Sequence, residues 1–210
     1  MAPTHTKSYM HVTDLLRGND TVSVNLYEIR DRALESRRLV FDYGQLSILA
    51  GIPRGQARVY ASRLVSRGLA QKVVDGTVSF TADPFVVATQ LVEPSYVSMM
   101  SALYLRGALT QVPAEVQCVT PVKSGTVRSP RIRYHRLTPA LFFGFERIER
   151  LGGYVFAATV EKAVLDSVYF WGEAPRVRTD LAALRSMAEA YGRRGGPRAR
   201  RTARWADSHD

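Results

Sequence analysis

The chain has 210 residues, 46% of them hydrophobic, and a formal net charge of +10, a composition that excludes disorder throughout. No uncharged apolar run reaches the roughly 18 residues of a membrane span, and residues 1–20 hold no apolar segment typical of a signal peptide. We therefore expect a cytoplasmic protein with one large domain or two modest ones.

The N-terminal half begins with a predicted helix-turn-helix. We expect residues 1–19 to be flexible, and apolar residues at helical spacing then predict an amphipathic helix over Val24 to Leu39. A second helix is expected within Phe41 to Pro53, where Gly51 can supply the left-handed turn that ends it. Pro53 suits the first turn of another helix. This order of helix, tight turn and helix is typical of a DNA-binding motif.

The next predicted helix is basic and amphipathic, with an apolar face that runs from Ala57 to Val65. From Pro53 to Lys72 the chain has five basic residues and no acidic one, as expected of a phosphate-binding surface. The polar face of such a helix reaches base edges and phosphates in the major groove of DNA. The residues expected to read bases are Arg54, Gln56, Arg58 and Ser62, and those expected to hold phosphates are Arg63, Arg67 and Lys72.

A two-stranded hairpin is predicted after Gly68, with short strands at Leu69 to Val74 and Thr77 to Thr81. Asp75-Gly76 between them is a strong tight-turn signal. This hairpin would be the wing of a winged helix-turn-helix, with Lys72 and Thr77 touching the DNA backbone or a minor groove. The alternatives are a solvated basic helix, or a winged helix that binds protein instead of DNA.

We predict an α+β protein with a winged helix over residues 20–82, a linker at 83–93, a smaller mixed α/β domain at 94–190 and a tail at 191–210. Ser95 is expected to cap the first helix of the second domain and Gly107 to stop it. The remaining strands are expected at Glu115 to Thr120, Arg131 to Leu137 and Tyr154 to Ala157, and the helices at Val160 to Tyr169, capped by Thr159, and at about Asp180 to Tyr191.

Three segments of the C-terminal half carry a family resemblance. They are Tyr96-Val97-Ser98 with Ser101-Ala102-Leu103 and Gly107, Gln111-Val112-Pro113 with its strand to Thr120, and Ala157 to Asp166, where Glu161-Lys162-Ala163 and Leu165-Asp166 are the most specific. With the N-terminal motif, over roughly Val24 to Phe170, the chain resembles the AbiEi-type antitoxins, the transcriptional regulators of viral defence found in bacteria and archaea.

This resemblance implies a repressor of its own operon that acts through the N-terminal domain. It also implies, for many members, a C-terminal domain that neutralises a nucleotidyltransferase-type toxin, as in type IV toxin–antitoxin and abortive-infection systems. We therefore expect a sequence-specific regulator that binds double-stranded DNA at its own promoter. The alternative is an antitoxin that mainly binds a toxin, with DNA binding secondary. Monomer and dimer both stay open, because no coiled-coil heptad is present.

No catalytic residue, metal site or cofactor is predicted, and we expect a protein that is not an enzyme. Glu161, Lys162 and Asp166 invite a nuclease interpretation, but Glu161 and Lys162 are adjacent and would point about 100° apart on a helix. We expect Glu161 to favour the positive helix start and Asp166 to pair with Lys162 at i+4. The four histidines show no ligand-like spacing, and the single cysteine, Cys118, is expected to be buried and inert.

Two further segments are basic. Lys123 to Arg136 contains no acidic residue, and alternation predicts one strand face that contacts DNA, contacts an acidic toxin or is solvated. The tail is predicted to be a disordered cationic arm that adds salt-sensitive affinity for nucleic acid. The basic residues concerned are Lys123, Arg128, Arg131, Arg133 and Arg136 in the first segment, and Arg193, Arg194, Arg198, Arg200, Arg201 and Arg204 in the tail.

Overall fold

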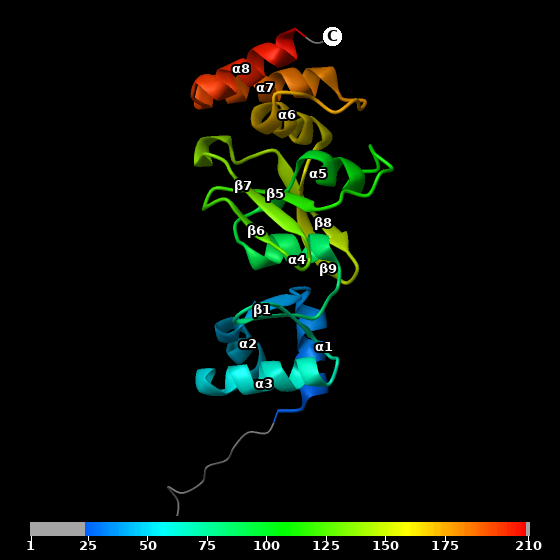
Figure 1. Cartoon of the computed structure of the whole chain (residues 1–210), viewed down its shortest axis with the longest axis vertical. Coiled ribbons are helices and arrows are strands. Elements are labelled where there is room, and N and C mark those ends of the chain that lie inside the picture. Colours follow the sequence, from blue (N-terminus) through cyan, green and yellow to red (C-terminus); the bar gives the residue numbers. More distant parts are fainter. Residues whose placement is uncertain (1–23, 209–210) are drawn as a thin grey trace, which may run out of the picture.

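The computed structural model describes residues 24–208, which form an α+β fold with two separate sheets. The expected flexible segment, residues 1–19, lies outside the described residues. Figure 1 shows a small N-terminal unit at one end of the long axis, a larger sheet in the middle and the last helices of the described chain at the other end. Within residues 24–208, no helix has both the length and the apolar character that crossing a membrane would require.

The N-terminal unit packs three helices against a three-stranded antiparallel sheet of order β1-β3-β2. Its elements are α1 (Leu26–Ser36), β1 (Val40–Asp42), α2 (Tyr43–Ala50), α3 (Arg54–Ser66), β2 (Gln71–Val74) and β3 (Thr77–Ser79). The predicted helices and the hairpin are confirmed. Strand β1 was not predicted, because three residues are too few to show an alternating pattern.

Local capping explains where α2 begins and ends. The Asp42 side chain accepts from the Gln45 backbone N–H at 2.7 Å, and the Gln45 side chain accepts from the Asp42 N–H at 3.0 Å. This reciprocal capping box satisfies two donors at the helix start. Gly51 ends α2 in the left-handed conformation, with φ +66°, as the sequence predicted.

The core of this unit is made by the apolar faces of its helices together with Phe41 and Val78 from the sheet. On α3, Ala57, Tyr60, Ala61 and Leu64 are buried as predicted. Val65, expected on the same face, is 36% exposed because it lies at the edge of that face.

The C-terminal unit is built on a six-stranded mixed sheet of order β6-β7-β5-β4-β9-β8. Its elements are α4 (Pro84–Leu91), β4 (Tyr96–Val97), α5 (Met99–Leu105), β5 (Val116–Thr120), β6 (Gly125–Val127), β7 (Ile132–Arg136), the 3-10 helix η2 (Pro139–Leu141), β8 (Phe145–Arg150), β9 (Gly153–Ala158), α6 (Val160–Trp171), α7 (Leu181–Arg194) and α8 (Pro197–Asp207). Strand β4 runs parallel to β9, and β5 runs parallel to β7, whereas the other neighbours are antiparallel.

The expected linker at residues 83–93 is wrong, because most of it is the buried helix α4. Asp83 caps this helix, accepting from the backbone N–H groups of Phe85 and Val86 at 2.9 Å each, and Pro84 occupies its first turn. All residues from Phe85 to Gln90 are buried. A helix that is buried on all sides lacks a polar face, so its sequence shows no helical period and the pattern did not reveal it.

The sequence predicted that Ser95 caps a helix, and this prediction is wrong. Strand β4 comes between, and Ser98 takes the N-cap position of α5. The prediction that Gly107 lies at the C-terminal stop agrees with its left-handed backbone, φ +70°.

The tail, expected to be disordered, instead forms α8 over most of its length. This helix packs on α7 and α6 through small side chains, and Ala199, Thr202 and Ala206 are buried. Helices α7 and α8 can approach closely because residue 192 is a glycine; a Cβ at this position would lie only 3.3 Å from Ala203 Cβ. Small residues at a spacing of three and four make an apolar stripe that the arginine-rich composition concealed.

A polar network lies inside the C-terminal unit, centred on Lys162 and Asp166 of α6. Both side chains are fully buried, and their predicted pairing is confirmed with Lys162 Nζ 2.8 Å from Asp166 Oδ1. Asp166 Oδ2 accepts from Tyr96 Oη at 2.9 Å and Ser98 Oγ at 2.6 Å, and Tyr191 Oη bonds to both charged groups. Lys162 Nζ also donates to the Leu141 carbonyl at 3.0 Å. The charges are therefore buried with their hydrogen-bonding capacity used.

Lys162→Met should strongly destabilise the fold, because it leaves the Asp166 carboxylate buried without its cation. We expect the free energy of unfolding in urea to fall by about 3–5 kcal/mol. The matched control is Glu161→Gln, one residue away, where a partly exposed side chain accepts from the Asp180 N–H. That change should cost less than about 1 kcal/mol. Equal losses for the two variants would contradict the assigned role of Lys162.

Alkaline pH should weaken the fold through Tyr96 and Tyr191. Burial, followed by the Asp166 charge, raises the pKa of each phenol well above the usual value of 10.0. The unfolded chain therefore loses these protons first, so the stabilisation is complete below about pH 10 and is lost as the pH rises further. Phenolate absorbance during an alkaline titration should show these two tyrosines ionising only as the chain unfolds.

Candidate nucleic-acid interface

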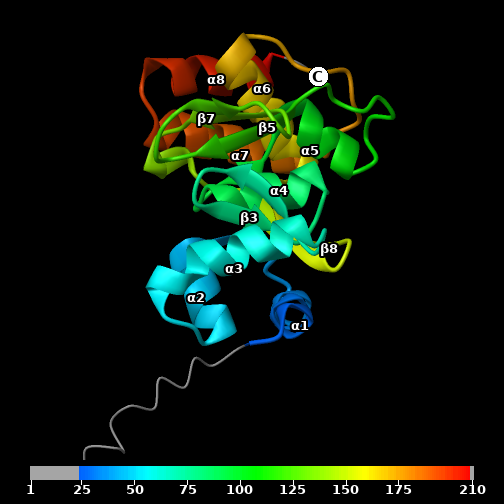
Figure 2. The same ribbon diagram turned by 60° about the horizontal axis from the view of Figure 1, so that its bottom comes forward.

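Helix α3 presents an exposed basic surface at the end of the molecule opposite α8 (Figure 1). In Figure 2, where this end comes forward, α3 lies across the unit with no other element in front of it. The side chains of Arg54, Arg58, Ser62 and Arg63 are exposed, whereas Gln56 is half-buried.

The predicted DNA-reading residues form two rows, not one cluster. With about 100° between successive residues, Arg54, Arg58 and Ser62 fall along one edge of the exposed face. Gln56 and Arg63 fall along the opposite edge, and the Arg63 guanidinium lies 5.5 Å from the Tyr60 ring.

The strip between the two rows carries small side chains that the sequence analysis did not select. Val59 is 49% exposed there, and Gly55 has open space where a Cβ would be. The sequence signal for this strip was Val59, an apolar residue on the polar face of a basic helix. A helix with a small central strip can bring its backbone close to a flat or grooved partner.

A shallow groove of about 340 Å³ separates α3 from the hairpin. The structure brings the predicted residues Arg58, Ser62 and Lys72 together along it. Tyr43, at the start of α2, also lines the groove and was missed, because its place beside α3 depends on the tertiary fold.

The predicted contact residues on the hairpin, Lys72 and Thr77, are less available to a partner than those on α3. Lys72 Nζ lies 2.6 Å from Asp75 Oδ1 in the turn, and this hydrogen bond raises the pKa of Lys72 and lowers that of Asp75. Thr77 is half-buried opposite Asp42 of β1, and Arg67 is exposed just after α3. A phosphate at Lys72 would therefore compete with Asp75 for the ammonium group.

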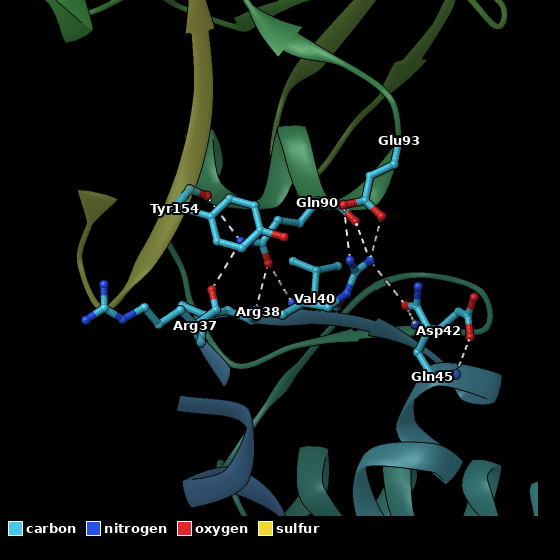
Figure 3. A network of polar contacts seen from close by, with 9 residues as sticks. Arg37, Arg38, Val40, Asp42, Gln45, Gln90, Glu93 and Tyr154 are labelled. Carbon is cyan, nitrogen blue, oxygen red and sulfur yellow. Dashed lines mark hydrogen bonds and ion pairs between the residues drawn. The ribbon is translucent and has the colours of Figure 1, made fainter. Parts of the chain in front are cut away.

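A network of polar contacts fixes the N-terminal unit, and with it α3, to the C-terminal unit (Figure 3). The side chain of Gln90 on α4 is 2% exposed and reaches the start of β1. Its carbonyl oxygen accepts from the Leu39 and Val40 N–H groups at 2.7 and 3.2 Å, and its amide donates to the Tyr154 carbonyl at 3.1 Å. One amide therefore joins β1, α4 and β9.

Arg38 extends this network to the start of α2. Its guanidinium makes two bonds to the Glu93 carboxylate, at 3.1 and 2.9 Å, and donates to the Gln45 side chain at 3.3 Å. Because Gln45 is also half of the α2 capping box, the junction and the start of α2 share a hydrogen-bonded residue (Figure 3). Arg37 adds an exposed ion pair to Glu149 of β8 at 3.0 Å.

Gln90→Leu should destabilise the chain, because it keeps the side-chain volume but leaves buried backbone N–H groups of β1 unpaired. We expect the free energy of unfolding to fall by at least about 1–3 kcal/mol. The matched control is Gln111→Leu, at an exposed loop position, which should be near neutral. Urea denaturation of both variants measures the difference, and two near-neutral results would show that the amide does not join the units.

The second basic surface lies on β7 and the loops around it. Arg131 and Arg133 are exposed while Ile132 and Tyr134 are buried, which confirms the predicted alternation. Lys123, Arg128 and Arg136 are exposed as well. The Arg133 charge is engaged by Glu115 at 2.6 Å, so this surface is less cationic than its sequence suggested.

The carboxylates that invited a nuclease interpretation do not meet. Asp166 is enclosed in the polar network, whereas Glu161 is partly exposed and bonds to the Asp180 backbone.

Cys118 is fully buried, and burial raises the pKa of its thiol, as its expected inertness requires. No group of three or more metal-ligating side chains is found in residues 24–208, and His5, His11 and His209 lie outside them.

Comparison of the chain with known protein families gives no match to any family, and comparison with curated protein sequences gives no significant match.

Proposed function

We propose that the N-terminal unit is a winged helix-turn-helix that binds duplex DNA, with α3 in the major groove and the β2–β3 hairpin as the wing. The order helix, strand, helix, helix, strand, strand supports this proposal, as does the Gly51 turn between α2 and α3. The observation that carries it is the exposed face of α3, which has arginines along both edges and small residues between them.

In this proposal the two edges have different tasks. Arg54 and Arg58 reach base edges in the major groove of the DNA, and Ser62 lies on the same edge of α3 as these two residues. An arginine in that position can make two hydrogen bonds to guanine. Arg63 and Arg67 hold phosphates and so set the register of the protein on the duplex. Val59 in the central strip is of a size to touch a thymine methyl group.

At the level of the cell, we propose a transcriptional regulator that represses its own promoter by occupying it, and that is not an enzyme. The resemblance to AbiEi-type antitoxins supports this role. The second candidate is neutralisation of a nucleotidyltransferase-type toxin by the C-terminal unit. The exposed arginines of β7 favour it, since they lie outside the N-terminal unit and suit an acidic protein surface.

Arg58→Ala should weaken binding to the promoter by about 1–3 kcal/mol if Arg58 makes two hydrogen bonds to one base. Fluorescence anisotropy with the protein's own promoter fragment and a scrambled duplex, at two salt concentrations, measures the loss and its selectivity. Arg178→Ala removes an equal charge from an exposed position in the C-terminal unit and should leave affinity unchanged.

A second variant, Gly55→Glu, tests the placement of α3 without altering its core. The new side chain enters open space, so the fold should be retained, and its charge should abolish binding to both duplexes by repelling phosphates. Wild-type binding that does not distinguish promoter from scrambled DNA would argue against sequence reading and favour the toxin-binding role. Full affinity in Gly55→Glu would show that α3 does not enter the groove.

A further inference from the structure

A pocket of about 420 Å³ lies between the last turn of α6 and one face of α8. Figure 1 shows these two helices at the end of the molecule opposite α3. This volume is within the usual range for small-molecule sites, roughly 300–1,000 Å³. The residues that line it are Val168, Tyr169, Phe170, Trp171, Gly172, Arg198, Arg201, Thr202 and Trp205.

The walls of the pocket are aromatic. Both tryptophans of the chain, Trp171 of α6 and Trp205 of α8, contribute to it, together with Tyr169 and Phe170 of α6. Trp171 is 42% exposed, although large aromatic side chains are usually well covered. An exposed indole beside other rings offers a surface on which a planar ring can stack.

The cationic side of the pocket is built by α8. Arg198 is fixed there, because it donates to the Phe170 carbonyl at 2.8 Å and lies over the Tyr169 and Phe170 rings at 5.0 and 5.9 Å. Arg201 is exposed and has no ion pair or hydrogen-bond partner in the part of the chain that the structure describes. Among the described residues that line the pocket, none is acidic. The site therefore suits a ligand that is both planar and negatively charged.

The end of α6 supplies acceptors as well. Of the last carbonyl groups of α6, that of Val168 accepts from the Gly172 N–H at 2.9 Å and that of Phe170 accepts from Arg198, so the carbonyls of Tyr169 and Trp171 are the ones without a hydrogen bond among the described residues. A ring with amino groups can donate to such carbonyls, while a sulfate-like anion without a ring cannot.

We propose that this pocket binds a nucleotide, with its base stacked on Trp171 and its phosphate held by Arg201. The combination of aromatic platforms with arginines is the one that proteins use for unpaired nucleotides. The ligand is either a free mononucleotide or the terminal nucleotide of a single strand, and the two share the same base and phosphate chemistry. This site is separate from the proposed duplex-binding surface on α3.

The test uses the tryptophan fluorescence of the full chain, since both indoles of the protein line the pocket. The probes are AMP and UMP, a short single-stranded oligonucleotide and inorganic phosphate. We expect saturable quenching by at least one mononucleotide or by the oligonucleotide, and no saturable change with inorganic phosphate. A response to mononucleotides identifies a free ligand, and a response to the oligonucleotide alone identifies a strand end; either supports the proposal.

Arg201→Ala should weaken nucleotide binding about tenfold or more, whereas Arg200→Ala should not. The two residues are adjacent and both exposed on α8, but only Arg201 lines the pocket. Arg58→Ala should leave the quenching unchanged. A failure of DNA binding by α3 can therefore be distinguished from a failure of nucleotide binding in the pocket. No saturable quenching by any nucleotide, equal weakening in both α8 variants, or equal competition by phosphate would overturn the proposal.

Discussion

The buried side chain of Gln90 hydrogen-bonds the N-terminal unit to the C-terminal unit, at the place where Leu39 and Val40 pack into the core of the C-terminal unit. The start of β1 has two backbone N–H groups that face α4, and no strand of the larger sheet pairs with them. An unpaired buried donor is costly, so the amide of a single α4 residue sets where β1 can lie. Because β1 leads directly into the capped start of α2 (Figure 3), this contact also bears on the position of α2, and α3 follows α2 after the Gly51 turn.

The Lys162–Asp166 pair imposes the second constraint, on how α6 and α7 pack against the sheet. Burying an ion pair gains little by itself, because desolvation offsets the attraction. Here the pair also forms hydrogen bonds with Tyr191 of α7, with Tyr96 of β4 and with the carbonyl of Leu141. Burial lowers the pKa of Lys162, while the adjacent carboxylate raises it, so the charged lysine depends on that partner. The network therefore selects one arrangement of α6, α7 and the sheet.

Much of the N-terminal unit could be predicted from sequence, because its signals are local. Gly51, Asp75-Gly76 and the spacing of the α3 apolar face each act within a few residues. The elements that were missed or misassigned depend on distant partners. Helix α4 is buried on every side and shows no period, and α8 hides a stripe of small residues within an arginine-rich sequence. The part that Tyr43 plays beside α3 also arises only from tertiary packing.

The position of α8 changes what its arginines can do. A disordered arm could fold back onto DNA held by α3, and its charge would then add to that of the recognition surface. As a helix packed on α6 and α7, it lies at the opposite end of the long axis from α3 (Figure 1). Exposed charges separated by more than about 10 Å are largely screened at moderate salt. The arginines of α8 therefore act on whatever lies against the C-terminal helices, and the DNA affinity proposed for α3 would rest on the charge of its own unit.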